Sequence, residues 1–371
     1  MAEEQCFEVD FLAVGEGEKC GDAIAIRFGM PGNYKVLVFD GGTKDAGAAL
    51  VKHIREHYNT ERVDYVVNSH PDRDHASGLS VVLEELDVGE VWMHQPWNYS
   101  DEIRHYFHDG RITDDSLARR LQEKMAAAYA LEELATEKGI PIHEPFAGST
   151  IGGAFKILSP NKDWYVHTLI QEFAKSPDQK KSLAEVLGLD SIYGTLKSAA
   201  ESVVNWIQER WDFESLREDV TTSAENESSV VLFGGTTNRG ILLTGDAGIR
   251  ALHKAADYAD SIGLSLKDRA NIVQIPHHGG RHNVSTTALD RILGERLPDE
   301  TPPTRQAIAS VGKTCETHPR PVVVNAFIRR GYTVAKTKGT GVLYRINAPE
   351  RPGWNKPIPS LSFADRVEAW E

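Results

Sequence analysis

Residues 63–79, VDYVVNSHPDRDHASGL, decide the fold expected for this chain. The apolar run Val63–Ser69 predicts a short strand, because valine and tyrosine favour pleated, half-buried backbone. Pro71 stops regular strand pairing directly after it, and apolar residues at helical spacing resume in Ser77–Leu86. The stretch therefore predicts a strand, a polar loop and a helix, a unit typical of layered folds of helices and sheets.

The polar loop holds four potential metal ligands within six residues, namely His70, Asp72, Asp74 and His75. In extended backbone, His70 and Asp72 point to the same side, and Asp74 and His75 can turn toward a second position. Nitrogen and carboxylate oxygen together suit zinc, iron or manganese. The plainer interpretation is a surface loop with two chance histidines. The density of ligands at a strand end, and the further clusters along the chain, favour a metal site.

Other side chains of the same kind follow other predicted strands. They are Asp40 before Gly41 and Gly42, Asp246 in TGDA, His277 and His278 in PHHGG, and His318 in CETHP. Taken singly, an aspartate before glycine indicates a turn, and a histidine near proline is usually solvated. Sheet topology can bring the ends of several strands together, so a rigid scaffold can assemble one metal site from all of them.

Strand and helix patterns alternate in two portions of the chain, about 1–95 and 222–347. Besides the strand and helix above, the expected strands are Phe7–Val14, Ala23–Phe28, Lys35–Asp40, Val88–Met93, Ala154–Ser159, Ser229–Gly234, Gly240–Thr244, Asn271–Ile275, Gln306–Val311, Tyr332–Ala335 and Gly341–Ile346, and the expected helices are Asp45–Tyr58, Ser116–Lys138, Ala247–Ile262, Ser285–Glu295 and Arg320–Arg330. Residues of about 96–220 are expected as a mainly helical insertion within one domain, 1–347. Residues 348–371 are expected to form a tail on the surface.

Composition limits the class of protein. The chain has 371 residues, 40% hydrophobic and 26% charged, which is enough for a large core and excludes a disordered or fibrous protein. Three cysteines are too few for a disulfide framework, so a reducing cytoplasm is expected. We expect no signal peptide and no membrane segment. The net charge of −13 disfavours unspecific attraction to nucleic acid or anionic lipid.

The order of these motifs resembles the metallo-β-lactamase superfamily, and within it the hydrolase domain of the competence DNA-uptake protein ComEC and its soluble relatives. The segments that match, in order, are VGEG…GDAIAIRF, VLVFDGG, NSHPDRDHASGL, ENESSVVL, GILLTGDA, VQIPHHGG, SVGKTCETHP and GTGVLYR. The likeness covers about 1–95 and 222–347 and leaves out the insertion. It implies an α+β fold, an αββα sandwich with a metal centre along one sheet edge.

The resemblance also implies a ligand set for two divalent metal ions, zinc or manganese. His70 and Asp72 would bind one ion, Asp74 and His75 the second, and Asp246 would bridge them. One of His277 and His278, together with His318, would complete the site or contact substrate. Asp40 would orient ligands from behind, the usual role of a carboxylate next to a metal histidine.

Two positions depart from the commonest superfamily pattern. Asp72 stands where histidine is usual, although ComEC-like members resemble this chain in using aspartate. Many members of the superfamily also have a histidine between the loop and TGDA. This chain shows no such histidine, and Asn226 or Ser228 stands near that place. Oxygen-rich ligation of this kind favours manganese or magnesium over zinc.

The expected activity is that of a binuclear phosphodiesterase or nuclease acting through a metal-activated water. Asp74 is expected to aim the water, and His278 or His318 to stabilise or protonate the leaving oxygen. The alternatives are a hydrolase of a small substrate, such as a nucleotide messenger, lactone or thioester, and a regulatory subunit with a structural metal site.

Expected partners follow from charge. Lys313 and Arg281 are candidate contacts to a substrate phosphate, with solvated surface cations as the alternative. Residues 301–347 carry eight lysines and arginines against the single carboxylate Glu316, a net charge of +7, which predicts a nucleic-acid track. The alternative is that these cations lie on solvated helix faces. The insertion is a candidate docking surface for a protein partner.

Overall fold

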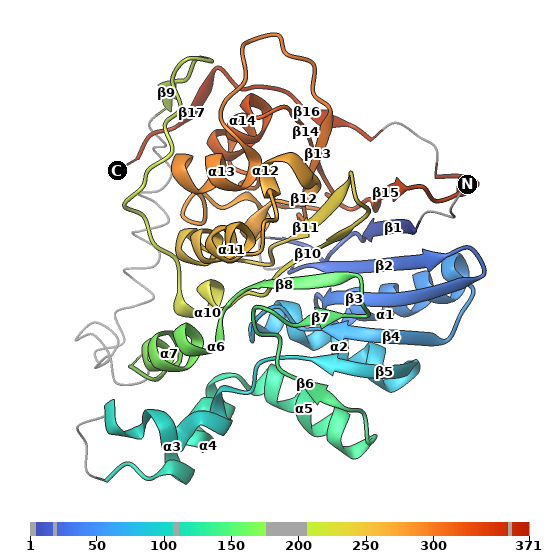
Figure 1. Ribbon diagram of the computed structural model, residues 1–371, viewed down its shortest axis with the longest axis vertical. Coiled ribbons are helices and arrows are strands. Elements are labelled where there is room, and N and C mark those ends of the chain that lie inside the picture. The colour runs from blue at the N-terminus through green and yellow to red at the C-terminus, as the bar shows by residue number, and fades with distance from the viewer. Residues whose placement is uncertain (1–4, 18–20, 107–110, 176–205, 355–357, 371) are drawn as a thin grey trace.

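Two β-sheets packed face to face form the centre of the structure (Figure 1). This computed structural model describes residues 5–17, 21–106, 111–175, 206–354 and 358–370. The first sheet has the order β15-β1-β2-β3-β4-β5-β6, with β1 Cys6–Phe11, β2 Ala23–Met30, β3 Asn33–Gly41, β4 Arg62–Val67, β5 Asp87–Trp92, β6 Ile142–His143 and β15 Val342–Ile346. The second has the order β16-β14-β13-β12-β11-β10-β8-β7, with β7 Thr150–Ile151, β8 Phe155–Ser159, β10 Val231–Gly235, β11 Gly240–Leu243, β12 Ala270–Gln274, β13 Arg305–Ala309, β14 Tyr332–Lys336 and β16 Ser360–Leu361.

Alternation along the strands explains why each sheet has two buried faces. In β2, Ile24 and Phe28 belong to the core between the sheets, whereas Ala25 belongs to the core under the helices. Phe28 meets Phe155 of the second sheet edge to face, with ring centroids 5.2 Å apart. Because successive side chains point to opposite faces, apolar residues at both positions require a layer on each side.

Helices supply those outer layers. Against the first sheet lie α1 Lys44–His53 with its π-helical extension η1 Ile54–Tyr58, α2 Arg73–Glu85 and α5 Ala126–Glu137, and against the second lie α11 Ile249–Ser261, α12 Leu266–Arg269, α13 Thr286–Leu293 and α14 Pro321–Arg329 (Figure 1). The result is a mixed α+β fold with the layers of an αββα sandwich, as expected. Across the described residues, no helix has the length and apolar character needed to cross a bilayer.

The range 96–220 contains both helices and strands. Its helical elements are η2 Pro96–Tyr99, α3 Ser100–Ile103, η3 Arg104–Tyr106, α4 Asp114–Lys124, α5, α6 Lys162–Trp164, η4 Tyr165–Leu169 and α7 Ile170–Lys175. The single helix expected at Ser116–Lys138 divides into α4 and α5 at the buried Met125, whose φ and ψ of −108° and 40° are not helical. Strand β6 belongs to the first sheet, and β7 and β8 belong to the second. This range therefore takes part in the sandwich. Further helices expected up to Val220 fall partly on residues 176–205, outside the described residues.

The segment after residue 347 is partly built into the fold. Strand β16 pairs with β14, and β17 Arg366–Glu368 pairs with β9 Trp206–Gln208. The guanidinium of Arg351 makes a two-pronged contact with Asp10 at 2.7 and 2.9 Å, and both side chains are buried. The surface tail expected from the sequence therefore contributes edge strands and a buried ion pair.

Candidate metal centre

The candidate ligands gather where neighbouring strands end. Asp40 lies near the end of β3, and His70 follows β4, the parallel neighbour of β3. Asp246 follows β11, and His277 and His278 follow its parallel neighbour β12. Parallel neighbours end at the same sheet edge, so this topology brings residues far apart in the sequence to one place.

The loop after β4 turns into helix earlier than its sequence suggests. Helix α2 begins at Arg73, so Asp74 and His75 belong to its first turn, and Asp72 is the residue before it. The side chain of Asp72 makes no capping hydrogen bond to the helix. Its Oδ2 instead lies 3.7 Å from Nε2 of His70. The helix start therefore presents its carboxylates to the site rather than to its own backbone.

Three candidate residues have left-handed backbone. The φ angles are 56° at Asp40, 49° at His277 and 57° at His278. This region disfavours residues that carry a Cβ, and such strain persists only where the surrounding structure fixes it, often at functional sites. Both histidines lie in η5 Pro276–Gly279, directly after β12.

The carboxylate of Asp246 is the centre of the cluster. Its Oδ2 lies 3.7 Å from Nε2 of His70, 3.5 Å from Nε2 of His75 and 3.6 Å from Nε2 of His277. Asp246 is 4% exposed, and its backbone N–H donates to Oγ of Ser229 at 3.1 Å. One buried carboxylate oxygen thus lies near three imidazoles, two from the segment after β4 and one from the segment after β12.

Hydrogen bonds fix the two histidines of the loop from behind. Oδ2 of Asp40 lies 2.9 Å from Nδ1 of His75 and accepts from Oγ of Ser69 at 2.6 Å, while Oδ1 accepts from the Ser69 backbone N–H at 2.7 Å. Oγ of Ser69 lies 2.9 Å from Nδ1 of His70. Asp40 therefore orients both rings with their Nε2 atoms toward Asp246, as a carboxylate behind a metal histidine does.

The second histidine pair is held in the same way. Nδ1 of His278 lies 2.8 Å from the backbone oxygen of Ser310, and Nδ1 of His277 lies 2.8 Å from Oδ1 of Asn283. Nδ2 of Asn226 lies 3.3 Å from the same His277 nitrogen. Asn226 therefore stands beside a histidine of the cluster, near the place where a ligand histidine was expected.

Unsatisfied buried atoms test whether these residues suit a metal ion. Nε2 of His70, Nε2 of His75, Oδ1 of Asp246 and Oδ2 of Asp22 are buried and have no hydrogen-bond partner among the described residues. Buried polar atoms without a partner are costly in free energy unless a ligand satisfies them. Neutral imidazole and carboxylate are suitable donors for divalent transition metals. The residues present therefore fit a metal ion.

Asp22 belongs to the cluster, although the motifs of the sequence do not predict it as a site residue. It is 1% exposed, its Oδ2 lies 3.9 Å from Nδ1 of His75, and burial raises its pKa. Its position directly before the buried strand β2, in the segment GDAIAIRF, was the available signal. An aspartate beside a strand is more often a turn residue, so that signal is weak without the fold.

Three groups place donor atoms within 4.8 Å of one another, and His75 is in all of them. They are Asp40, His70 and His75; Asp74, His75 and His278; and Asp22, His75 and Asp246. Asp72, His277 and His318 do not enter these groups. The predicted metal residues His70, Asp72, Asp74, His75, Asp246 and His277 therefore share one neighbourhood, but with unequal closeness.

The carboxylates and imidazoles of the cluster shift one another's pKa values. Burial raises the pKa of Asp246, but the nearby His277 and His75 outweigh it and hold that pKa well below its usual range. Burial lowers the pKa of His75, and Asp246 and Asp40 reverse this and raise it well above the ordinary value. Metal binding requires deprotonated imidazole and carboxylate, so a bound cation would replace the protons that hold this cluster together.

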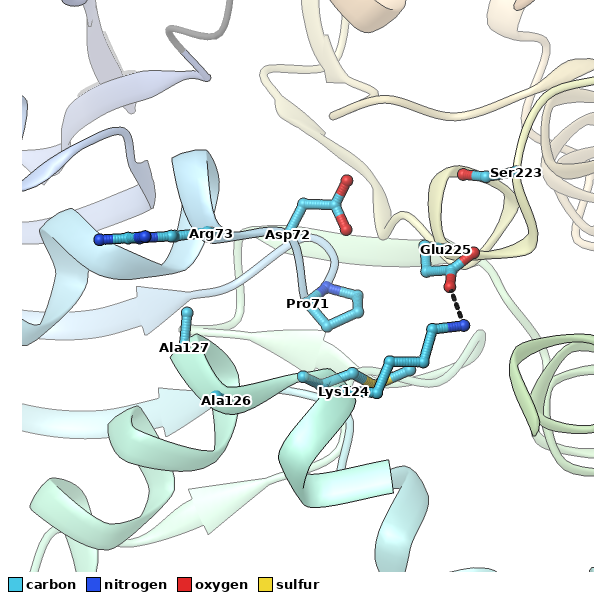
Figure 2. A pocket seen from close by; sticks show the side chains of 9 residues that line it. Pro71, Asp72, Arg73, Lys124, Ala126, Ala127, Ser223 and Glu225 are labelled. Carbon is cyan, nitrogen blue, oxygen red and sulfur yellow. Dashed lines mark ion pairs between the residues drawn. The ribbon is translucent and has the colours of Figure 1, made fainter. Parts of the chain in front are cut away.

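The centre opens into a cavity of about 760 Å³. Its lining includes Asp72, Asp74, Asp246, His277 and His278. A neighbouring cavity of about 460 Å³ is also lined by Asp72, beside Pro71 and Arg73 (Figure 2). The far wall comes from the junction of α4 and α5 and from α10 Ala224–Glu227, where Lys124 and Glu225 form an ion pair at 2.6 Å.

The remaining predicted contacts lie apart from the cluster. His318 lines a third cavity, of about 490 Å³, together with His277 and Arg281, and its Nδ1 lies 3.0 Å from Oγ1 of Thr317. Lys313 lines none of these three cavities and is 3.8 Å from Glu16, with both side chains 67% exposed. The structure thus brings Arg281 and His318 beside His277 but does not bring Lys313 to the site.

Comparison with known proteins gives one family match. The metallo-beta-lactamase superfamily model matches residues 22–148. Among solved structures, the metallo-beta-lactamase fold protein YhfI from Bacillus subtilis is 9% identical at a TM-score of 0.39, covering 92% of this chain and 99% of that one. A long form RNase Z from yeast is 11% identical at a TM-score of 0.32, covering 81% and 36%. No curated protein matches the chain. The family match covers residues 22–148, a range that includes the HPDRDH loop, so this part of the chain is similar to the metallo-beta-lactamase superfamily.

Proposed function

We propose that this chain is a metal-dependent hydrolase that cleaves phosphodiesters with a metal-activated water. The observation that carries the proposal is the Asp246 carboxylate on the wall of an open cavity, whose Oδ2 lies 3.5–3.7 Å from Nε2 of His70, His75 and His277. Structural metal sites are closed by protein ligands, whereas catalytic sites keep a position open. The open cavity therefore favours catalysis over a structural metal in a regulatory subunit.

Each protein group has a role in this proposal. His70 and Asp72 would hold one cation and Asp74 and His75 a second, with Asp246 as a ligand available to both. Bound divalent cations supply a Lewis acid and lower the pKa of a water molecule. Asp40 fixes His75 and, through Ser69, His70. Manganese or zinc suits this mixture of nitrogen and oxygen donors.

Asp74 and His278 are the proposed catalytic pair. Both line the cavity, and they share one close group with His75. Asp74 holds and orients the attacking water. His278 has Nδ1 directed at the Ser310 backbone oxygen, so its other nitrogen is the one available to give a proton to the leaving oxygen. His318 is the alternative donor from the neighbouring cavity.

A small substrate is the second candidate, and the burial of cations favours it. Arg329 and Arg330, two of the eight cations counted in residues 301–347, are 0% exposed. Arg330 pairs with Glu214 at 2.8 Å and Asp290 at 2.7 Å, and Arg329 pairs with Glu209 at 3.2 Å. This segment therefore presents less surface charge to a polymer than its sequence predicts, and a nucleotide-sized phosphodiester needs no long track.

Replacing Asp74 with alanine tests the proposal. Metal-loaded wild-type protein is expected to hydrolyse at least one of DNA, RNA, cyclic dinucleotides and a chromogenic phosphodiester. The variant is expected to lose at least about a hundredfold in kcat, because the group that orients the water is gone, while its thermal unfolding shifts only by the lost metal-binding contribution. Near-normal turnover in a folded variant would refute the role of Asp74. Wild-type protein that binds metal and hydrolyses none of the substrates would favour the structural-metal alternative.

We further propose that α4 and α5 form a cap beside the metal loop, since their junction walls the cavity that Asp72 shares (Figure 2). Ala127→Trp is expected to fill much of that cavity. We expect kcat/KM for the preferred substrate to fall about tenfold with metal content unchanged, because a bulky ring excludes substrate from its site. Ala130→Trp, at an exposed position of the same helix, is the matched control. Equal kinetics for the two variants would mean that substrate does not use this cavity.

A further inference from the structure

The third cavity differs in charge from the metal cavity beside it. Its lining consists of Thr221, Thr222, His277, Gly280, Arg281, His282, Asn283, His318 and Arg320. This lining has two arginines and three histidines and no carboxylate. The metal cavity, in contrast, is lined by the four carboxylates of Asp45, Asp72, Asp74 and Asp246 and by two cations, Lys44 and Arg73. The third cavity therefore has the more positive lining and is the one that suits anions.

His277 joins the two cavities. It lines both of them, and its Nε2 lies 3.6 Å from Oδ2 of Asp246 in the metal cluster. A ligand in the cationic cavity therefore lies one side chain away from the proposed reaction centre. A substrate with two anionic groups a few bonds apart can place one in each cavity.

The cations of the third cavity are held in place by the C-terminal segment. Nη1 of Arg281 donates to the backbone oxygen of Ala369 at 2.9 Å, and its guanidinium lies 4.5 Å from the ring centroid of Trp370. Nη1 of Arg320 lies 3.3 Å from Oε1 of Glu368. A guanidinium has five N–H donors in a planar fork, so a contact through one nitrogen fixes Arg320 and leaves donors that can bind phosphate.

We propose that this cavity binds a second phosphate group of the substrate, one that is not hydrolysed; the inference rests on the proposed phosphodiesterase activity. Arg281 and Arg320 supply guanidinium donors, and Thr221 and Thr222 are polar side chains within the same lining. The amide of Asn283 is already bonded to His277 and to the backbone oxygen of Asp246. The preferred substrate class is accordingly a short nucleotide chain with a terminal phosphate next to the scissile diester. The arginines determine specificity in this scheme and take no part in bond cleavage.

Three dinucleotides with the same internal diester test the proposal with metal-loaded protein. They are thymidylyl-thymidine without a terminal phosphate, with a 5′-phosphate, and with a 3′-phosphate. One of the phosphorylated forms is expected to have kcat/KM at least about tenfold above the plain dinucleotide, a gain typical of charge-assisted hydrogen bonds. Whether the 5′-phosphate or the 3′-phosphate gives the gain identifies the direction in which the dinucleotide lies across the two cavities. Equal kcat/KM for all three substrates would overturn the proposal.

Variants assign the gain to the cavity. Arg281→Gln and Arg320→Gln are expected to bring the ratio of phosphorylated to plain substrate close to one, and Arg281→Lys and Arg320→Lys to retain part of it. Arg291→Gln is the control, since this arginine pairs with Asp257 and Asp260 on the outer helices. Both glutamine variants could instead lower kcat/KM equally for all three substrates and leave the ratio of phosphorylated to plain substrate unchanged. In that case the arginines only anchor the C-terminal segment, and the proposal fails.

A binding measurement separates this inference from the proposed function. Thymidine 5′-monophosphate and 3′-monophosphate are titrated into metal-free protein by calorimetry, so that no cation can bind the phosphate. The wild type is expected to bind one of them at least about tenfold more tightly than either glutamine variant does. Absence of cleavage with such binding would refute the hydrolase but keep the phosphate site. Cleavage without any difference in monophosphate binding or in the substrate ratio would keep the hydrolase and refute the phosphate site.

Discussion

Replacing Asp246 with alanine is expected to remove bound metal and to lower turnover by at least about a thousandfold, within the range that positioned groups of a reaction centre supply. The reason is its place in the cluster. Its Oδ2 lies within 3.7 Å of Nε2 in each of His70, His75 and His277, and no other carboxylate in the described part of the chain pairs with all three of these nitrogens. Elemental analysis after dialysis and steady-state kinetics are the measurements.

The control for this variant is Asp45→Ala. Asp45 lines the same cavity but is exposed, in the first turn of α1, so its loss is expected to leave metal content unchanged. The free energy of unfolding of the Asp246 variant should also depend less on pH at acidic pH than that of the wild type. Asp246 has its pKa held well below the usual range, so it contributes stability above its unfolded pKa, and that contribution is lost as the pH falls through the folded pKa. Full metal content in Asp246→Ala would contradict its central place.

Sequence alone predicts the fold well where strands are short and strongly apolar. The local signals are ligand-type residues that directly follow a buried strand. They occur in the HPDRDH loop, at Asp40 before its two glycines, and in the segments TGDA and PHHGG. What gathers them is the parallel pairing of β3 with β4 and of β11 with β12. A sandwich fold therefore makes the cluster of Asp40, His70, His75, Asp246 and His277 predictable once the strands are placed.

Other features depend on long-range packing and leave no local pattern. Asp22 joins the cluster only because β2 lies beside β3 and carries its first residues to the same edge. Arg329 and Arg330 look like surface cations in the sequence, yet Glu209, Glu214 and Asp290 bury them as ion pairs. Charge counts along a chain cannot distinguish such buried pairs from a basic surface, because the partners come from distant segments.

Helix α2 approaches the end of β3, the strand that carries Asp40, at backbone distance. A Cβ added to Gly78 would lie 1.9 Å from the backbone oxygen of Gly41 and 2.6 Å from that of Thr43. The backbone N–H of Gly78 donates to the oxygen of Gly42 at 2.9 Å. Since the contacts are with backbone, no side-chain rotation can relieve them. Gly78→Ala therefore forces α2 away from the end of β3.

That displacement should reach the metal centre, because α2 begins with the turn that carries Asp74 and His75, while Asp40 stays with β3. We expect the free energy of unfolding to fall by about 1–3 kcal/mol or more and turnover by about a hundredfold, since a shift of roughly 1 Å in a reacting group can have that effect. Chemical denaturation and kinetics are the measurements. Ser80→Ala in the same helix, where Oγ only donates to the backbone oxygen of Ser77, should be near neutral in both. Unchanged stability and activity in Gly78→Ala would contradict this coupling, because helix and strand could then separate while the 2.9 Å contact between Asp40 and His75 is kept.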